Sequence, residues 1–272
     1  MRIEIETASV TDKGLNPLYL VNEDSYLVLE KERVFAVADG VGGAHAGDVA
    51  SQSALGTIKN MALNVKQNAK TLHDDSISFL KNLISAGNTV IYNESKRKQQ
   101  QMASTIAIMV IEDDYAILGH VGDSRIYVHR GRNLIQLTRD HSRLQALIDS
   151  SSLKLTNEID YQDRHIITKA LGVEPSVEPD IQKVILKNND IFILCTDGIY
   201  THNSNSEILD NISRNRHDLK KACEEFKDKC YQKGAKDNLT AIVLRIEKKD
   251  DDETITKRLK TTHDMINTTV KK

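Results

Sequence analysis

The sequence has no tryptophan, three cysteines and three prolines, and aromatic residues make up only 4% of its 272 positions. The core is therefore expected to consist mainly of isoleucine, leucine, valine and alanine. The cysteines stand at 195, 223 and 230, a spacing that fits neither a zinc site nor a disulfide framework. Their scarcity favours a reducing compartment, and we expect the protein in the cytoplasm.

An excess of charge of one sign is also lacking, since the formal net charge is −2. No basic stripe stands out, so binding to nucleic acid has no electrostatic support. The longest apolar run, 106–111, is too short to span a bilayer, and the first residues lack the apolar stretch of a signal peptide. We expect a chain without a membrane or nucleic-acid partner, and a monomer.

Two segments show the period of amphipathic helices, at 46–65 and at about 75–98. In the second, Ile77, Leu80, Ile84 and Ile91 are predicted to face the core. A third helix is expected at about 217–233. Short connections between 104–111, 115–121, 125–129 and 134–137 predict four strands that pair as one antiparallel meander. Residues 142–182 are irregular and polar, and are expected to form a helical flap that selects substrates.

The strands at 105–111 and 239–246 are apolar on both faces. A strand of an antiparallel sheet that is buried on both faces must be covered by another sheet and by helices. The sequence therefore predicts an α+β fold, a four-layer α-β-β-α sandwich with two mainly antiparallel sheets packed face to face. Residues 1–247 are expected to form this domain, and 248–272 a charged, flexible tail.

Against this background, acidic residues recur at the ends of apolar runs. Asp39-Gly40 and Asp197-Gly198 each follow such a run, and Asp237-Asn238 directly precedes one. A strand holds the acid in place, and the glycine lets backbone carbonyls come close to what it binds. Acids spread along the chain without a cluster of histidine or cysteine indicate a site of oxygen ligands for a hard divalent cation. Taken singly, each pair could also be an ordinary turn.

Seven short motifs follow one another in a fixed order: Asn22-Glu23-Asp24, Asp39-Gly40, Gly122-Asp123-Ser124-Arg125, Asp140-His141-Ser142, Lys169-Ala170-Leu171-Gly172, Asp197-Gly198 and Asp237-Asn238. In this order they resemble the metal-dependent protein phosphatases of the PPM or phosphatase-2C type, and more closely the bacterial members. The resemblance extends from about Thr11 to Ile246, which is nearly the whole chain outside the tail.

The resemblance implies two divalent cations, Mn²⁺ or Mg²⁺, and a third that binds more weakly. Asp39 would bridge the first two ions, with Glu23 and the Gly40 carbonyl on one, Asp197 and Asp237 on the other, and Asp123 at the third. The physical chemistry agrees, because several carboxylates in one site would raise each other's pKa unless cations neutralise them. Two such ions also allow a bridging water or hydroxide to attack phosphorus in line, so no side-chain nucleophile is needed.

Three positions depart from the family pattern. Tyr19 stands where an arginine commonly grips the substrate phosphate, so we expect Tyr19 or Lys13 to assist and the affinity for substrate to be lower. Val41 replaces a histidine that can protonate the leaving group, which leaves a metal-bound water or His141 for that role. Thr201 replaces a further acid, which weakens the expected third site.

Structural roles compete with these interpretations. Glu23 and Asp24 could be a solvated pair, Asp123 could pair with Arg125 to fix a turn, and Asp140-His141 could cap a helix that begins near Ser142. The histidines interpreted as packing or surface residues rather than ligands are His45, His120 and His165.

The sequence thus predicts a cytoplasmic serine/threonine phosphoprotein phosphatase that opposes a cognate bacterial-type kinase in signal transduction. One alternative is a phosphomonoesterase for small molecules. Another is a catalytically weak or silent regulatory scaffold with the same fold, a possibility to which Tyr19 lends support. Retention of the core acids argues against the scaffold, because acids without a metal destabilise a fold.

Overall fold

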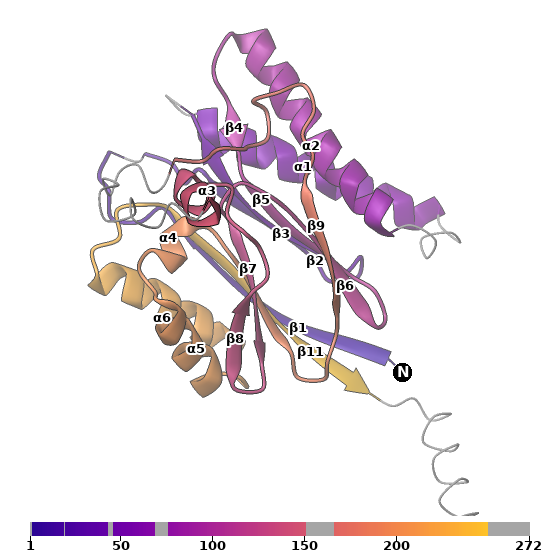
Figure 1. Ribbon diagram of the computed structural model, residues 1–272, viewed down its shortest axis with the longest axis vertical. Coiled ribbons are helices and arrows are strands. Elements are labelled where there is room, and N and C mark those ends of the chain that lie inside the picture. The colour runs from indigo at the N-terminus through magenta and orange to yellow at the C-terminus, as the bar shows by residue number, and fades with distance from the viewer. Residues whose placement is uncertain (1, 19, 43–45, 69–75, 151–165, 250–272) are drawn as a thin grey trace, which may run out of the picture.

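The computed structural model of the protein describes residues 2–18, 20–42, 46–68, 76–150 and 166–249. Two antiparallel sheets form its centre (Figure 1). The first has the order β1 (Arg2–Asp12), β11 (Leu239–Lys249), β10 (Ile191–Cys195), β7 (Arg125–Arg130) and β8 (Asn133–Gln136). The second has the order β2 (Asp24–Leu29), β3 (Val34–Val41), β5 (Ile106–Ile111), β6 (Tyr115–Val121) and β9 (Asp180–Ile185), while the short β4 (Ala103–Ser104) pairs with β3.

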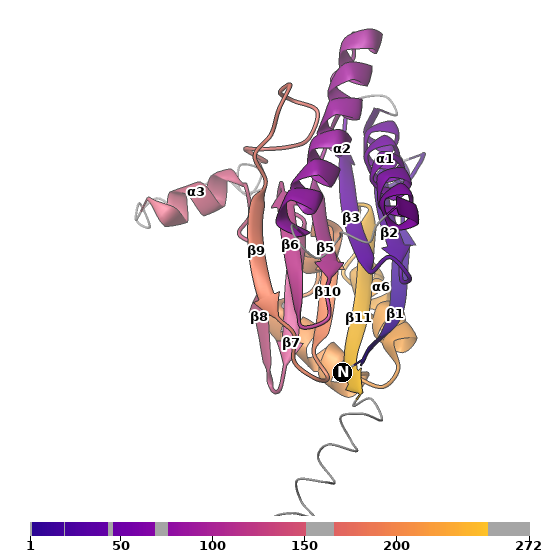
Figure 2. The same ribbon diagram turned by 90° about the vertical axis from the view of Figure 1, so that its right-hand side faces the viewer.

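Helices cover the outer face of each sheet, as Figure 1 shows. The long helices α1 (Ala46–Asn68) and α2 (Ser76–Lys98) pack on the second sheet, and α4 (Asp197–Tyr200), α5 (Asn205–Arg214) and α6 (Leu219–Gln232) pack on the first. Helix α3 (Arg143–Asp149) has no buried residue and projects from the layered body (Figure 2). The predicted four-layer α-β-β-α sandwich is confirmed.

Three apolar clusters fill the spaces between these four layers. The middle cluster lies between the sheets and includes Phe35, Met109, Phe192 and Ile242. The outer two lie between each sheet and its helices. Every residue of β5 and of β10 is buried. This explains why their sequences are apolar throughout instead of alternating, because both faces of these strands lie against another layer.

The prediction of one four-stranded meander is wrong. Strands β5 and β6 pair in the second sheet, whereas β7 and β8 pair in the first, and β6 has β9 as its other neighbour. The chain crosses between the sheets in the short link after Val121, where Gly122 adopts a φ of +103°. A side chain at this position would be strained, and its Cβ would lie 2.6 Å from Thr105 Cγ2. A short connection therefore joins the two sheets here instead of forming a hairpin.

The residues predicted to face the core from the second helix are confirmed except at one position. Leu80, Ile84 and Ile91 of α2 are fully buried, but Ile77 is 44% exposed because the buried face begins with Ser76 and Leu80. All three cysteines are free and buried. The predicted flap contains α3, while its residues 151–165, with Asp160, Asp163, Arg164 and His165, lie outside the described residues. Strand β11 continues to Lys249, two residues past the predicted domain boundary, and 250–272 of the expected tail are also outside.

No helix in the described part of the chain combines the length and the apolar character needed to cross a membrane.

Candidate metal centre

Acidic residues from both sheets meet at one end of the sandwich. The register of β2 with β3 places Asp24 opposite Asp39 in the second sheet. In the first sheet, Asp197 lies two residues after the end of β10, and Asp237 lies two residues before the start of the neighbouring strand β11. Asp123 follows β6 in the link between the sheets. The strands thus bring together acids that are far apart in sequence.

Hydrogen bonds across the two sheets fix the Asn-Glu-Asp segment in place. Asn238 accepts a bond from the Glu23 amide (2.7 Å) and donates through Nδ2 to the Lys13 carbonyl (2.9 Å). Thr196 donates through Oγ1 to Asp24 Oδ2 (2.8 Å). Asp24 is only 6% exposed, so the alternative of a solvated Glu23–Asp24 pair is wrong for Asp24.

Glycines allow the backbone to approach these acids closely. A Cβ on Gly40 would lie 1.9 Å from the carbonyl oxygen of Gly47, and a Cβ on Gly47 would lie 2.7 Å from Glu23 Cδ. Neither position can hold a side chain, so the Gly40 backbone, the first turn of α1 and the Glu23 carboxylate share one small volume. Gly47 carries no signal in the sequence, because its role depends on contact between α1 and the end of β3.

The electrostatics of the cluster favour protonated acids in the absence of cations. Burial, reinforced by neighbouring carboxylates, raises the pKa of Asp24 to about 7 and that of Asp123 to about 6. The pKa values of Asp39 and Asp197 are raised well above their usual range by burial first. For both groups the charges of Asp24, Asp123 and Asp237 add to the effect. This mutual influence shows that the five side chains form one electrostatic unit.

Two oxygens of this cluster have no hydrogen-bond partner among the described residues. Asp24 Oδ1 and Asp197 Oδ1 are both buried and unsatisfied. A buried carboxylate oxygen without a donor is costly, and a divalent cation removes the cost because it prefers oxygen ligands. The donor set of the cluster therefore fits the divalent cations that the family resemblance implies.

An ion pair between Arg125 and Asp140 holds the turn beside the cluster. Arg125 pairs with Asp140 through Nε (3.0 Å) and Nη2 (2.6 Å), so the proposed Asp123–Arg125 turn is wrong. The guanidinium group also lies 3.6 Å from the centroid of the Tyr200 ring, and the Tyr200 hydroxyl donates to the Asp123 carbonyl (3.1 Å). Ser142 caps α3 by accepting from Gln145 N, so Asp140 is not the cap.

The other residues singled out in the sequence have varied surroundings. Tyr19 and His45 lie outside the described residues. Lys13 is exposed, and its carbonyl is held by Asn238. Val41 is exposed. Thr201 is exposed too, and its hydroxyl donates to the Asp197 carbonyl (2.7 Å).

Comparison with known proteins gives a family for this fold and site. The family described as Protein phosphatase 2C matches residues 19–243. The serine/threonine phosphatase stp of Listeria monocytogenes serotype 4b (strain F2365) is 30% identical over 229 residues, covering 82% of this chain and 89% of that protein. Protein phosphatase PhpP of Streptococcus pneumoniae serotype 2 (strain D39 / NCTC 7466) is 29% identical over 214 residues, covering 79% and 86% of the two chains.

A solved structure supports the same relationship. The catalytic domain of the serine threonine protein phosphatase PstP, crystallised with two manganese ions, has a TM-score of 0.77 and 27% identity. The match covers 91% of this chain and 100% of that chain. The fold and the acid cluster define a metal-dependent phosphatase. The chain belongs to the protein phosphatase 2C family, as its motifs indicated.

Proposed function

We propose that this protein is a metal-dependent serine/threonine phosphatase that hydrolyses phosphomonoesters on proteins. The observation that carries this function is the buried cluster of acids between the two sheets, with unsatisfied oxygens on Asp24 and Asp197. A fold does not retain several buried carboxylates with raised pKa values for stability, but a centre that binds cations requires them. The bacterial phosphatases to which the chain is similar agree with this activity.

We assign the ligands by position in the cluster. Glu23 and the Gly40 carbonyl would hold one ion, Asp197 and Asp237 the other, with Asp39 shared between them and Asp123 at a third, weaker site. When bound, such ions lower the pKa of a water to near neutrality and neutralise the oxygens of the phosphoryl group. The relative crystallised with two manganese ions favours Mn²⁺, and Mg²⁺ has the same preference for oxygen ligands.

The cysteines of this chain do not supply a nucleophile. Cys195 stands two residues before Asp197, but burial raises the pKa of its thiol to about 12. Burial likewise raises the pKa of Cys223 to about 12 and that of Cys230 to about 11. A thiol with such a pKa remains protonated and unreactive near neutral pH. This supports attack by water rather than a covalent phosphocysteine.

His141 is a poor candidate for the acid that protonates the leaving group. Its Nδ1 accepts a hydrogen bond from the Gly122 amide (3.1 Å), and its Nε2 lies 3.3 Å from Asp180 Oδ1. Both ring nitrogens are therefore already engaged, and Val41 carries no proton to donate. We infer that a water molecule held at the metal centre would supply this proton. We propose that Lys13 or Tyr19 contacts the phosphate group of the substrate.

The wider setting follows from the same assignment. We propose phosphoprotein substrates, a cognate serine/threonine kinase with opposite activity, a role in signal transduction, and a monomeric protein in the cytoplasm.

The experiment that tests this function is phosphate release from a phosphothreonine peptide with Mn²⁺, with Mg²⁺ and with EDTA. We expect turnover only with a divalent cation and its loss in Asp39→Asn. Asp113→Asn is the matched control, because Asp113 is an exposed acid that pairs with Arg33 at the surface. A parallel panel of small phosphomonoesters separates a protein phosphatase from a metabolite phosphatase. A folded protein without turnover in any metal would contradict the proposal and favour the regulatory scaffold.

A further inference from the structure

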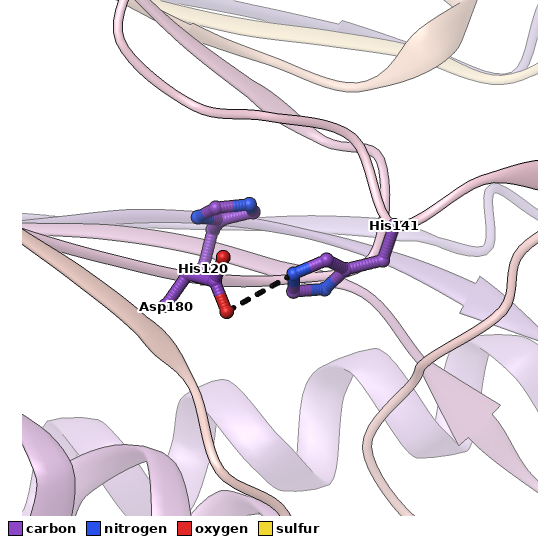
Figure 3. Close-up of side chains that lie close together, drawn as sticks. All are labelled: His120, His141 and Asp180. Atoms are coloured by element: carbon purple, nitrogen blue, oxygen red, sulfur yellow. Dashed lines mark ion pairs between the residues drawn. The ribbon is translucent and has the colours of Figure 1, made fainter. Parts of the chain in front are cut away.

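Polar groups outside the acid cluster differ in whether the protein satisfies them. The ring of His141 stacks on that of His120, and its Nε2 lies 3.3 Å from Asp180 Oδ1 (Figure 3). Because His141 Nδ1 accepts from the Gly122 amide, Nε2 carries the proton and faces the Asp180 carboxylate. Both nitrogens of His141 are thus engaged within the protein. Two buried nitrogens without a partner lie elsewhere, at the opposite end of the sandwich.

A cavity of about 480 Å³ lies at that end, across three neighbouring strands of the first sheet. The strand register places His129 of β7, Ile191 of β10 and Arg245 of β11 in one row, and all three line the cavity. The links 187–190 and 216–217 complete the lining. A cavity of this volume is in the range that holds a small organic molecule. The metal centre lies beyond the other ends of β10 and β11, so the two sites are separate.

Positive charge predominates in the lining of this cavity. Four cationic side chains and one acid line it: Arg130, Lys187, Arg216, Arg245 and Asp190. Acids pair with the two arginines of the strands, Asp190 with Arg130 (2.6 Å), and Glu6 and Glu247 with Arg245 (2.6 and 2.9 Å). Lys187 and Arg216 are exposed, and in the described part of the chain neither has an acidic partner. Two positive charges therefore remain without a counter-charge at one cavity.

The two nitrogens without a hydrogen-bond partner among the described residues are Arg245 Nε and His129 Nδ1, in two residues of this lining. A guanidinium Nε always carries a proton, so it is a donor without an acceptor. His129 is only 6% exposed, and its Nε2 lies 3.2 Å from Ser213 Oγ. Because a hydroxyl group can donate as well as accept, this contact allows the proton of the neutral ring to sit on Nδ1. Buried donors of this kind are costly unless a ligand supplies the acceptor.

We propose that this cavity binds a small phosphorylated molecule. A phosphate group brings negative charge and several acceptor oxygens, and the lining lacks both. Arginine recognises phosphate through its planar fork and lysine through its point charge, so Arg216 and Lys187 would hold the phosphate group. The covered nitrogens of Arg245 and His129 come within reach when the exposed side chain of His217, whose Nδ1 lies 3.2 Å from Arg245 Nη1, turns away.

The test is a calorimetric titration of the full chain, freed of metal ions on a chelating resin, with inorganic phosphate, pyrophosphate and ADP. Without cations the acid cluster repels these anions, so the heat of binding reports on the cavity. We expect submillimolar binding of pyrophosphate or ADP. Lys187→Gln and Arg216→Gln should each weaken it by at least about tenfold, because each removes a hydrogen bond between charged groups. Tighter binding of ADP than of pyrophosphate would show that the organic part enters the cavity, and equal binding that the phosphates alone are recognised.

Lys81→Gln is the matched control, because Lys81 is a lysine of α2 that lies outside the cavity and pairs with Glu178. It should bind the probes as the wild type does. Lys187→Glu reverses the charge and should weaken binding more than Lys187→Gln does. Thermal unfolding checks the fold of each variant. Absence of binding to the wild type, or equal affinity in the wild type, Lys187→Gln and Arg216→Gln, would overturn the proposal, and neither result depends on phosphatase turnover.

Discussion

In the absence of divalent cations, the free energy of unfolding of the protein should fall as the pH rises from 5 to 8. The pKa of Asp24 is about 7 in the folded chain, against a usual value of 3.8, mainly because the carboxyl group is buried. Between these two values the folded state binds more protons than the unfolded state. The free energy of unfolding therefore falls as the pH rises through this window. Asp39 and Asp197, whose pKa values are also raised, act in the same direction.

The size of the effect can be worked out for Asp24 alone. Each pKa unit corresponds to about 1.4 kcal/mol, so the full shift from the unfolded to the folded value is worth about 4 kcal/mol. About 3 kcal/mol of this falls between pH 5 and pH 8. Small domains have a free energy of unfolding of about 5–15 kcal/mol, so the loss is large. The lowered pKa values of His120 and His141 act in the opposite direction to that of Asp24. A lowered histidine pKa contributes stability that is lost as the pH falls, so this contribution grows as the pH rises.

Comparison of the wild type with Asp24→Asn removes the titration of this group and also its influence on the pKa values of Asp39 and Asp197. The asparagine carbonyl can still accept the bond from Thr196, but the side chain no longer titrates. We expect urea denaturation in EDTA to show a pH dependence that is smaller in the variant by at least about 3 kcal/mol, because the pKa values of Asp39 and Asp197 also fall when the charge of Asp24 is removed. Mn²⁺ should stabilise the wild type more at pH 8 than at pH 5. Equal pH dependence in the two proteins would refute the reasoning.

Three further substitutions test the packing around the site by chemical denaturation. Arg125→Ala should cost about 3–5 kcal/mol, because it leaves the Asp140 carboxylate buried without its partner, and addition of Asp140→Asn should recover part of that loss. Gly198→Ala should destabilise the protein and impair metal binding, since the new Cβ would lie 1.9 Å from the Asn238 carbonyl oxygen; wild-type behaviour would contradict this contact. Gly56→Ala, inside α1 with no atom within 4 Å, should stabilise by about 0.5–1 kcal/mol, and a loss of stability would show that α1 is more tightly packed there.

The layers of the fold could be predicted because burial on both faces leaves a direct mark in the sequence. Strand β5 is apolar at every position, and only a strand between two layers tolerates that pattern. The pairing of the strands left no such mark. The connection after β6 is as short as a hairpin, but the positive φ of Gly122 directs the chain into the other sheet. Local periodicity cannot distinguish these two outcomes, so the meander was predicted wrongly.

The candidate site divides in a similar way. The acids at strand ends could be found because each has an apolar strand on one side and a turn residue on the other. Gly47 and Tyr200 could not be found, because their contacts with Glu23 and with Asp123 depend on how helices pack against the sheets. The same holds for the partner of Arg125, which lies 15 residues away rather than in the adjacent turn.

The cost of the acid cluster bears on the choice between an enzyme and a silent scaffold. Asp24 lies in a buried environment where an asparagine would keep the bond to Thr196 without the charge. A chain that needed only the fold would therefore gain stability by losing this carboxylate. The argument is stronger for Asp39 and Asp197, because each raises the cost of ionising the others. Several buried carboxylates kept together make physical sense only if cations occupy the space between them, and a bound cation pair is what phosphomonoester hydrolysis by water requires.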